Sequence, residues 1–338
     1  MAEIVTSPPT GPPPPASTGV GGRRRLGRTL ARLFEPVRHA QGLPRWLLWT
    51  GAGLVAFFVV LAVFAPLLAP YGFDQYQGPG GRFPKQGPPS KEHWFGTTVQ
   101  SLDVLSRVIF GARTALEVVV LAVVFSLLVG VPLGLASGYL GGKLDRVLVL
   151  VMDALFAFPY LLLAIVIAFL LSGTFGGVAT AALAITVVYV PQYFRVVRNS
   201  TISAREATYV EAARALGAGP VTVMTRYLFA NVIQSVPVIA TLNAADAILT
   251  LAGLGFLGYG IQPTEAAEWG YDLQRAVADA GAGIWWTGLF PGLAIMLLVT
   301  GLTLVGEGLN ELVNPTLRRR RITPVVLPPR ASGPAVTR

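Results

Sequence analysis

Long uncharged, apolar runs separated by charged segments dominate the chain. A helix needs about 20 apolar residues to cross the hydrocarbon core of a bilayer, so each run of that length predicts one span. The predicted spans are about 46–68, 118–139, 147–171, the stretch that ends before Arg195, 237–260 and 284–306. No charge lies between Asp153 and Arg195, and the Gly-rich segment 172–177 divides that stretch into two spans joined by a tight hairpin. The pattern therefore predicts an all-α integral membrane protein with six transmembrane helices.

Composition supports this prediction and narrows the chemistry. Of the 338 residues, 13% are charged and 53% are hydrophobic, with a mean hydropathy of +0.60, whereas soluble domains devote about a quarter of their residues to charge. The net charge of +9 does not point to nucleic acid, because the basic residues lie in blocks between apolar runs. The absence of Cys excludes disulfides, a thiolate nucleophile and Cys-type metal sites, and His39 and His93 are the only histidines. We therefore expect no catalytic residue and no metal site on this chain.

The positive charges predict the orientation. Most of the 26 Lys and Arg residues lie in segments that face the cytoplasm if the N-terminus is cytoplasmic. The positive-inside rule then places both termini in the cytoplasm. The outer segment 71–114 is the exception, because it carries five basic residues. Its end, from Ser101 to Phe110, has the spacing of an amphipathic helix lying at the membrane interface.

The two ends of the chain differ in composition from the rest. Residues 1–22 are rich in Pro, Gly, Ser, Thr and Ala, and a basic stretch follows them. We therefore predict a disordered, basic cytoplasmic tail over 1–45. The first apolar run, 46–70, begins too late and lacks a small-residue cleavage signal, which indicates an anchor and not a cleaved signal peptide. Residues 115–314 hold the other five helices, and 315–338 form a second basic cytoplasmic tail.

The inside segment 195–236 has the pattern of helices, not of a linker. Good helix formers begin at Ser203, which with Glu206 resembles a capping box, and Gly217 stands where a helix would end. A second helix is predicted from Pro220, at a position where Pro starts helices well. Two short helices around a sharp Gly turn form a rigid protrusion suited to docking into a partner's groove.

Several motifs resemble those of the C-type permeases of dipeptide and oligopeptide ABC importers. Glu211-Ala212-Ala213 followed by Gly217 resembles their EAA loop, which forms the coupling helix that seats on the ATPase subunit. Further matches, in the family's order and spacing over 93–314, are His93-Trp-Phe-Gly-Thr, Asp103-Val-Leu-Ser-Arg, Ala157-Phe-Pro, Phe256-Leu-Gly-Tyr-Gly-Ile-Gln-Pro and Glu268-Trp-Gly. The resemblance implies the type I ABC importer transmembrane-domain fold in a bacterial plasma membrane, with the permease core at 115–314.

The resemblance also implies which residues meet the energy source. The implied ATPase-coupling residues are Glu211, Ala212, Ala213, Arg214 and Gly217. Small Ala side chains let a partner's surface approach, the Glu side chain pairs with a cation, and Gly permits the chain to reverse. The implied partners are two ATP-binding subunits that hold ATP and Mg, a second homologous permease, an extracytoplasmic substrate-binding protein and membrane lipid. No cofactor is expected on this chain, and no nucleic acid.

The chain departs from the family pattern at a few positions. Phe229-Ala-Asn lacks the Pro that usually follows the EAA helix, and Thr250 stands where the fifth span usually has Glu. Dipeptides or oligopeptides are the substrates that the resemblance implies. A nickel chelate, glutathione or an oligosaccharide stay open as alternatives, because relatives of similar sequence carry them.

Asp246 is the main candidate for the translocation path. It lies about nine residues into the fifth span, roughly 14 Å along the helix and close to mid-membrane. A carboxylate at that depth is costly unless it faces a polar cavity or a partner. With Asn243 one turn away it would meet a cationic or hydroxyl-rich substrate; a structural hydrogen bond to a neighbouring helix is the alternative. Asp153 is expected to be satisfied by interfacial water or by Arg146.

Other patterns bear on packing and on competing classes. Gly130, Gly134, Gly138 and Gly142 recur every four residues and predict a seam where another helix backbone approaches closely. Segment 141–144 lacks the Ser or Thr of a phosphate loop, so no ATP site is expected here. An ion-coupled secondary transporter would need no docking helix. A membrane-embedded enzyme would need a cluster of His, Ser or paired carboxylates at one depth.

Overall fold

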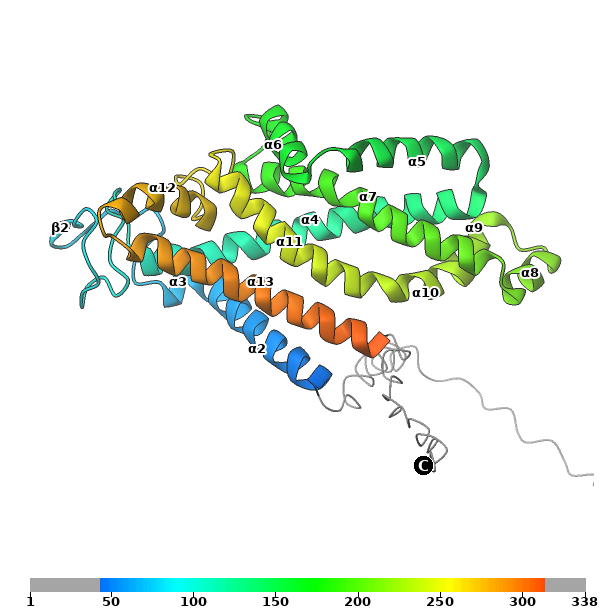
Figure 1. Cartoon of the computed structure of the whole chain (residues 1–338), viewed down its shortest axis with the longest axis horizontal. Helices are drawn as coiled ribbons and strands as arrows, with labels where there is room; N and C mark the ends of the chain where they lie inside the picture. Colours follow the sequence, from blue (N-terminus) through cyan, green and yellow to red (C-terminus); the bar gives the residue numbers. More distant parts are fainter. Residues whose placement is uncertain (1–42, 314–338) are drawn as a thin grey trace, which may run out of the picture. The chain divides into compact units, whose positions relative to one another are not determined.

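The computed structural model describes residues 43–313 (Figure 1). The predicted tails lie outside the described residues, except that the first helix already begins at Leu43. The helices are α2 (Leu43–Val63), α3 (Ala65–Leu68), α4 (Val104–Leu140), α5 (Gly142–Ala157), α6 (Tyr160–Leu171), α7 (Gly177–Arg205), α8 (Thr208–Ala215), α9 (Pro220–Thr222), α10 (Phe229–Val232), α11 (Val236–Phe256), α12 (Trp269–Gly281) and α13 (Trp286–Val313). A π-helical segment, Val223–Leu228, and a 3₁₀ turn, Ile233–Ser235, join α9, α10 and α11. Strands β1 (Gln77–Gly78) and β2 (Gly81–Arg82) pair antiparallel.

Five described helices, α2, α4, α7, α11 and α13, are long and apolar enough to cross a membrane. Helices α5 and α6 make a sixth span if they are taken together, and the two axes are bent by 99°. The span predicted over 147–171 therefore consists of two helices with a sharp bend between them and not of one continuous helix. Phe158 has an extended backbone (φ −75°, ψ 141°) because the ring of Pro159 disfavours helical geometry in the residue before it. Sequence periodicity does not reveal such a bend, since both halves are apolar.

Helix α4 is a single helix of 37 residues, about 55 Å long at 1.5 Å per residue. The separate interfacial helix predicted near Ser101 to Phe110 is not observed, because those residues lead directly into α4. Asp103 caps its start, accepting a hydrogen bond from the backbone N–H of Ser106 at 2.8 Å. Gly141, with φ +64°, lets the chain turn into α5. The first turns of α4 thus extend the second span beyond the hydrocarbon core.

The predicted glycine seam packs α4 against α7. A Cβ added at Gly130, Gly134 or Gly138 would come within 2.7 to 2.8 Å of atoms on α7, so only Gly allows the two backbones this close. Gly142 does not belong to the seam: it has φ +65° at the start of α5 and open space around it. Helix α2 packs along α13, and α11 packs between α13 and α7 (Figure 1).

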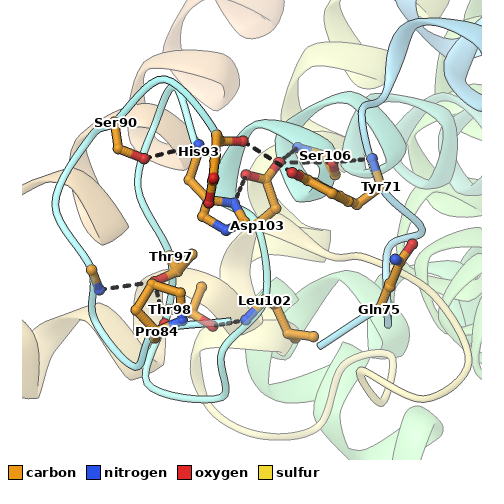
Figure 2. Close-up of polar contacts among 12 residues, drawn as sticks. Tyr71, Gln75, Pro84, Ser90, His93, Thr97, Thr98, Leu102, Asp103 and Ser106 are labelled. Carbon is orange, nitrogen blue, oxygen red and sulfur yellow. Dashed lines mark hydrogen bonds and ion pairs between the residues drawn. The ribbon is translucent and has the colours of Figure 1, made fainter. Parts of the chain in front are cut away.

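Polar contacts hold the first outer segment to the start of α4 (Figure 2). His93 Nδ1 lies 2.9 Å from Asp103 Oδ1, and both side chains are buried. The other carboxylate oxygen of Asp103 accepts from the Ser106 hydroxyl, which in turn accepts from the backbone N–H of Tyr71. His93 and Asp103 therefore have a structural role: they hold the first outer segment to the start of α4.

Helix α12 is fastened to α4 and α11 through the Glu268-Trp-Gly motif. The Trp269 indole donates to the carbonyl of Val108 at 3.1 Å, and Asp272 forms a buried ion pair of 2.7 Å with Arg107. A Cβ on Gly270 would meet the backbone of Ala252 at 2.1 Å. The motif therefore allows α12 to pack closely across the outer ends of two spanning helices.

Candidate functional site

The segment predicted to couple the chain to a partner forms α8. Helix α7 continues through Ser203 to Arg205, so the predicted capping box with Glu206 is wrong. Glu206 instead accepts a hydrogen bond of 2.8 Å from the Arg205 guanidinium. Ala207 has an extended backbone, and α8 begins after it. A short break, and not a capping side chain, separates the two helices.

The predicted end of this helix is confirmed. Gly217 has φ +83°, a left-handed conformation that Gly adopts at little cost. Its N–H donates to the carbonyl of Arg214 at 2.9 Å, and the N–H of Ala218 donates to that of Ala213 at 3.0 Å. These two hydrogen bonds satisfy carbonyl groups that the last helical turn would otherwise leave unpaired.

Helix α8 has one buried and one exposed face. Val210 and Ala213 are buried, whereas Glu211 and Ala212 are exposed. Leu216, directly after the helix, is 89% exposed, unusually so for a large apolar side chain. Exposed apolar side chains beside exposed charge are common at protein–protein contacts. The exposed face of α8 thus has the composition of a docking surface.

The other coupling candidates lie at the edges of this exposed face. Arg214 is exposed, and its guanidinium carbon lies 5.1 Å from the ring centroid of Tyr139 on α4. Ala213, in contrast, is buried. Of the two alanines in the Glu211-Ala212-Ala213 motif, Ala212 is therefore the exposed one. Glu211, Ala212 and Arg214 therefore share solvent access, whereas Ala213 shapes the inner packing.

A small apolar cluster supports α8 from below. Val210 packs with residues of α4, α7 and the segment that leads into α11, namely Val131, Leu135, Val197, Val223, Leu228, Val232 and Val236. The amide of Asn231 also donates to the Tyr209 hydroxyl at 2.6 Å. Residue 230 is Ala and not Pro, and α10 leads without a break in helical backbone toward α11. Helix α8 is therefore packed in one apolar cluster with residues of α4, α7 and α11.

A cavity of about 490 Å³ lies at the bend between α5 and α6. Helices α7 and α11 form its other walls, through residues that include Tyr189, Gln192 and Asp246. Aromatic rings line much of it: Phe156, Phe158, Tyr160 and Tyr189. Of the residues that line it, Asp246 alone carries a charge. The bend that sequence periodicity missed thus creates the space around the predicted intramembrane carboxylate.

Asp246 and Asn243 have different surroundings. Asp246 is exposed to the cavity, and no described residue donates a hydrogen bond to its carboxylate. Asn243 is 4% exposed and is not among the residues that line the cavity. Thr250 donates to the backbone carbonyl of Asp246 at 2.9 Å, and the Tyr189 hydroxyl lies 3.1 Å from the Thr250 oxygen. Tyr189 and Asp246 therefore line the same cavity, whereas Asn243 is packed away from it.

Two ion pairs join α5 to α7. Asp153 accepts a hydrogen bond of 2.8 Å from Arg195, so the expected partner Arg146 is wrong. Asp145 accepts two hydrogen bonds from Arg198, of 2.6 and 2.8 Å. Arg146 is close to Asp153 only in sequence, whereas Arg195 reaches it because α5 packs beside α7.

Sequence reasoning missed Arg195 as a neighbour of the cavity. Its guanidinium carbon lies 3.9 Å from the ring centroid of Phe156, which lines the cavity. The available signal was the spacing of Tyr189, Gln192 and Arg195, which places three polar side chains at successive turns of one helix. In the described part of the chain, no three His, Asp or Glu side chains come together as metal ligands would.

Comparisons with known proteins give a consistent result. A family model described as "Binding-protein-dependent transport system inner membrane component" matches residues 130–319. A model described as "N-terminal TM domain of oligopeptide transport permease C" matches residues 45–88. Together the two matches cover most of α2, the last part of α4 and all helices from α5 to α13, which include α8 and the residues that line the cavity.

Individual proteins are also similar. The dipeptide transport system permease protein DppC of Alkalihalophilus pseudofirmus is 37% identical over 271 residues, which cover 79% of this chain and 85% of that protein. The glutathione transport system permease protein GsiD of Escherichia coli O157:H7 is 35% identical over 269 residues, covering 80% and 86%. Among solved structures, the inward-facing MetNI methionine ABC transporter is 20% identical, with a TM-score of 0.49, and the match covers 62% of this chain and 96% of that chain.

Proposed function

This chain belongs to the family of binding-protein-dependent transport system inner membrane components, and on that premise we propose that it forms half of the import path for dipeptides or oligopeptides. It is a multi-pass permease of a bacterial ABC importer in the peptide and glutathione group. As a permease it carries out no chemistry of its own, and other components of the transporter supply the energy from ATP.

The cavity beside Asp246 is the observation that carries the substrate proposal. Its aromatic walls suit apolar side chains of variable shape, and its single carboxylate suits an ammonium group. A peptide with a free amino end offers both. Glutathione is the second candidate because a relative bears its name. Its two carboxylates against one ammonium group fit a cavity with a single Asp less well.

Helix α8 is the proposed point of coupling. Its exposed face, with Glu211, Ala212, Arg214 and the adjoining Leu216, would seat on one of two ATP-binding subunits that hold ATP and Mg. A second, homologous permease would complete the path, and an extracytoplasmic binding protein would deliver the substrate to the outer ends of the helices. Closure of the ATP-binding subunits would displace α8, and the packed cluster around Val210 would pass this movement to α4, α7 and α11.

Charge reversal at Glu211 tests the coupling proposal. The chain is purified gently from native membranes, its partners are identified, and ATPase activity is measured on the complex. We expect a second permease and ATP-binding subunits to co-purify with the unaltered chain. Glu211→Arg should reduce their recovery and the ATPase activity about tenfold or more, because it replaces an attraction across the interface with a repulsion.

Glu92→Arg is the matched control. Glu92 is also exposed, but it lies in the outer segment, so this variant should keep the ATP-binding subunits. Recovery of the unaltered chain alone, without ATPase activity, would contradict the proposal and favour an ion-coupled transporter with Asp246 as its ion site. Equal loss in the two variants would show that charge reversal disturbs the chain generally.

A further inference from the structure

Helix α7 continues the wall of the cavity toward Arg195. Tyr189 and Gln192 line the cavity, and Arg195 is the next residue at this spacing, about 4.5 Å further along the axis. Residues three apart are neighbours on a helix surface. The Arg195 guanidinium also stacks on Phe156, whose ring forms part of the cavity wall. A basic group therefore stands at the edge of a cavity whose lining holds one carboxylate.

The present partner of Arg195 is held loosely. One guanidinium nitrogen, Nη2, donates to Asp153, and the two side chains are 40% and 55% exposed. The neighbouring pair is tighter: Arg198 donates through two nitrogens to Asp145, and these side chains are 24% and 21% exposed. Exposed single-contact ion pairs contribute little to stability. Another carboxylate can therefore replace Asp153 at Arg195 at small cost.

The stretch of α7 between the cavity and Arg195 matches a short peptide in length. Asp246 and Tyr189 line the same cavity from α11 and α7. From Tyr189 to Arg195 the axis of α7 advances about 9 Å. An extended chain of two or three residues spans about 7 to 10 Å. The α7 surface from the cavity residue Tyr189 to Arg195 is thus about as long as a short peptide, with Asp246 in the cavity and a guanidinium beyond its edge.

We propose that Arg195 binds the C-terminal carboxylate of a short peptide whose ammonium group lies at Asp246. The incoming carboxylate takes the place of Asp153 and forms a two-pronged contact with the guanidinium, the geometry in which Arg binds carboxylates best. Arg195 is then a specificity-determining residue that distinguishes peptides with free C-terminal ends from blocked ones. This inference rests on the proposed function as a peptide permease.

The test uses the complete importer, with its partner subunits and binding protein, reconstituted in liposomes. Uptake of alanyl-phenylalanine is compared with uptake of its C-terminal amide. For each variant, the ratio of free-peptide uptake to amide uptake is divided by the same ratio for the unaltered importer. Every importer is paired with the same binding protein, so the preference of that protein cancels in this comparison. Arg195→Gln should lower the ratio of free peptide to amide about tenfold, through loss of one charge-assisted contact. Arg195→Lys should restore part of it.

Asp153→Asn distinguishes binding of the peptide carboxylate by Arg195 from a purely structural ion pair that holds α5 to α7. It breaks the same ion pair as Arg195→Gln but frees the guanidinium, so uptake of the free peptide at low concentration should rise about threefold. Arg198→Gln is the matched control, since it also breaks an ion pair between these helices but neither Arg198 nor its partner Asp145 lines the cavity. It should leave the ratio unchanged.

The outcomes are distinct. If Arg195→Gln and Asp153→Asn slow uptake of the free peptide and of the amide to the same extent, the ratio of the two uptakes does not change. Arg195 then only holds α5 to α7, and the inference is wrong. If the importer assembles and hydrolyses ATP but carries neither peptide, the proposed substrate class fails and the inference fails with it. If no ATP-binding subunit associates, the coupling proposal fails instead.

Discussion

Glu268 illustrates how much a single residue depends on its surroundings. Its two carboxyl oxygens accept from the backbone N–H groups of Gly270 and Tyr271, both at 2.7 Å, and so cap α12. The same carboxyl group packs against Gly255, where a Cβ would come within 1.7 Å of it. Burial raises the pKa of Glu268 to about 8 and outweighs the opposing effect of the two backbone hydrogen bonds. An exposed Glu at the same motif position would remain charged at neutral pH.

This raised pKa predicts a pH dependence of stability. The unfolded chain releases the proton near the ordinary pKa of Glu, about 4.3, whereas the folded chain keeps it up to about pH 8. Between these values the folded state binds more protons, so the contribution of Glu268 to the free energy of unfolding falls as pH rises. We expect Glu268→Gln, which stays neutral and keeps the shape, to flatten this slope. Tm of the detergent-solubilised chain measured from pH 5 to 9 checks it; identical slopes for the two proteins would contradict it.

At the scale of elements, the two faces of α8 have different surroundings, and the docking role is proposed for the exposed face alone. The buried face, with Val210 and Ala213, joins the cluster beneath it, and the exposed face ends at Leu216. The turn at Gly217 then returns the chain toward Pro220 and α9. Substitutions on the two faces should therefore have different consequences.

Leu216→Asp is predicted to weaken docking without weakening the fold. Its side chain is almost fully exposed, so the free energy of unfolding should change by no more than about 0.5 kcal/mol. Affinity for the ATP-binding subunits should fall about tenfold or more if Leu216 fills a pocket at the interface. Val210→Asp is the contrasting variant, because it places a charge in the buried cluster and should lower Tm. Unchanged affinity of Leu216→Asp would exclude this residue from the interface.

At the scale of the whole molecule, the proposed coupling site and the proposed translocation site lie in different parts of the described chain. Helix α8 lies at one end of the structure, and the bend of α5 and α6 lies along the upper edge of the view (Figure 1). Helices α7 and α11 take part in both, because they line the cavity and pack with the cluster below α8. This arrangement allows the two functions to be disturbed separately.

Asp246→Asn is predicted to lower uptake while leaving assembly intact. The amide keeps the size of the side chain but loses the charge that would meet an ammonium group, so peptide uptake should fall about tenfold. Recovery of the ATP-binding subunits and the basal ATPase activity should match those of the unaltered complex, since no residue of α8 lines the cavity. Normal uptake by Asp246→Asn would place this carboxylate outside the path.

The sequence by itself determined the features that depend on local chemistry. Runs of about 20 apolar residues specify spanning helices, because an uncharged helix is the simplest structure that satisfies its own backbone in lipid. The turn at Gly217, the start at Pro220 and the packing seam from Gly130 to Gly138 follow from the properties of single residue types. The family resemblance likewise rests on short motifs that are legible in sequence.

Only the tertiary structure decided which distant side chains meet. Asp153 pairs with Arg195 and not with Arg146, because helix packing and not sequence distance sets its neighbours. The bend at Phe158 opens a cavity whose walls come from four helices, and no periodicity along one segment encodes that shape. Asp246 and Asn243 are one turn apart in sequence, yet Asp246 alone reaches the cavity, because the direction of each side chain depends on what packs against α11.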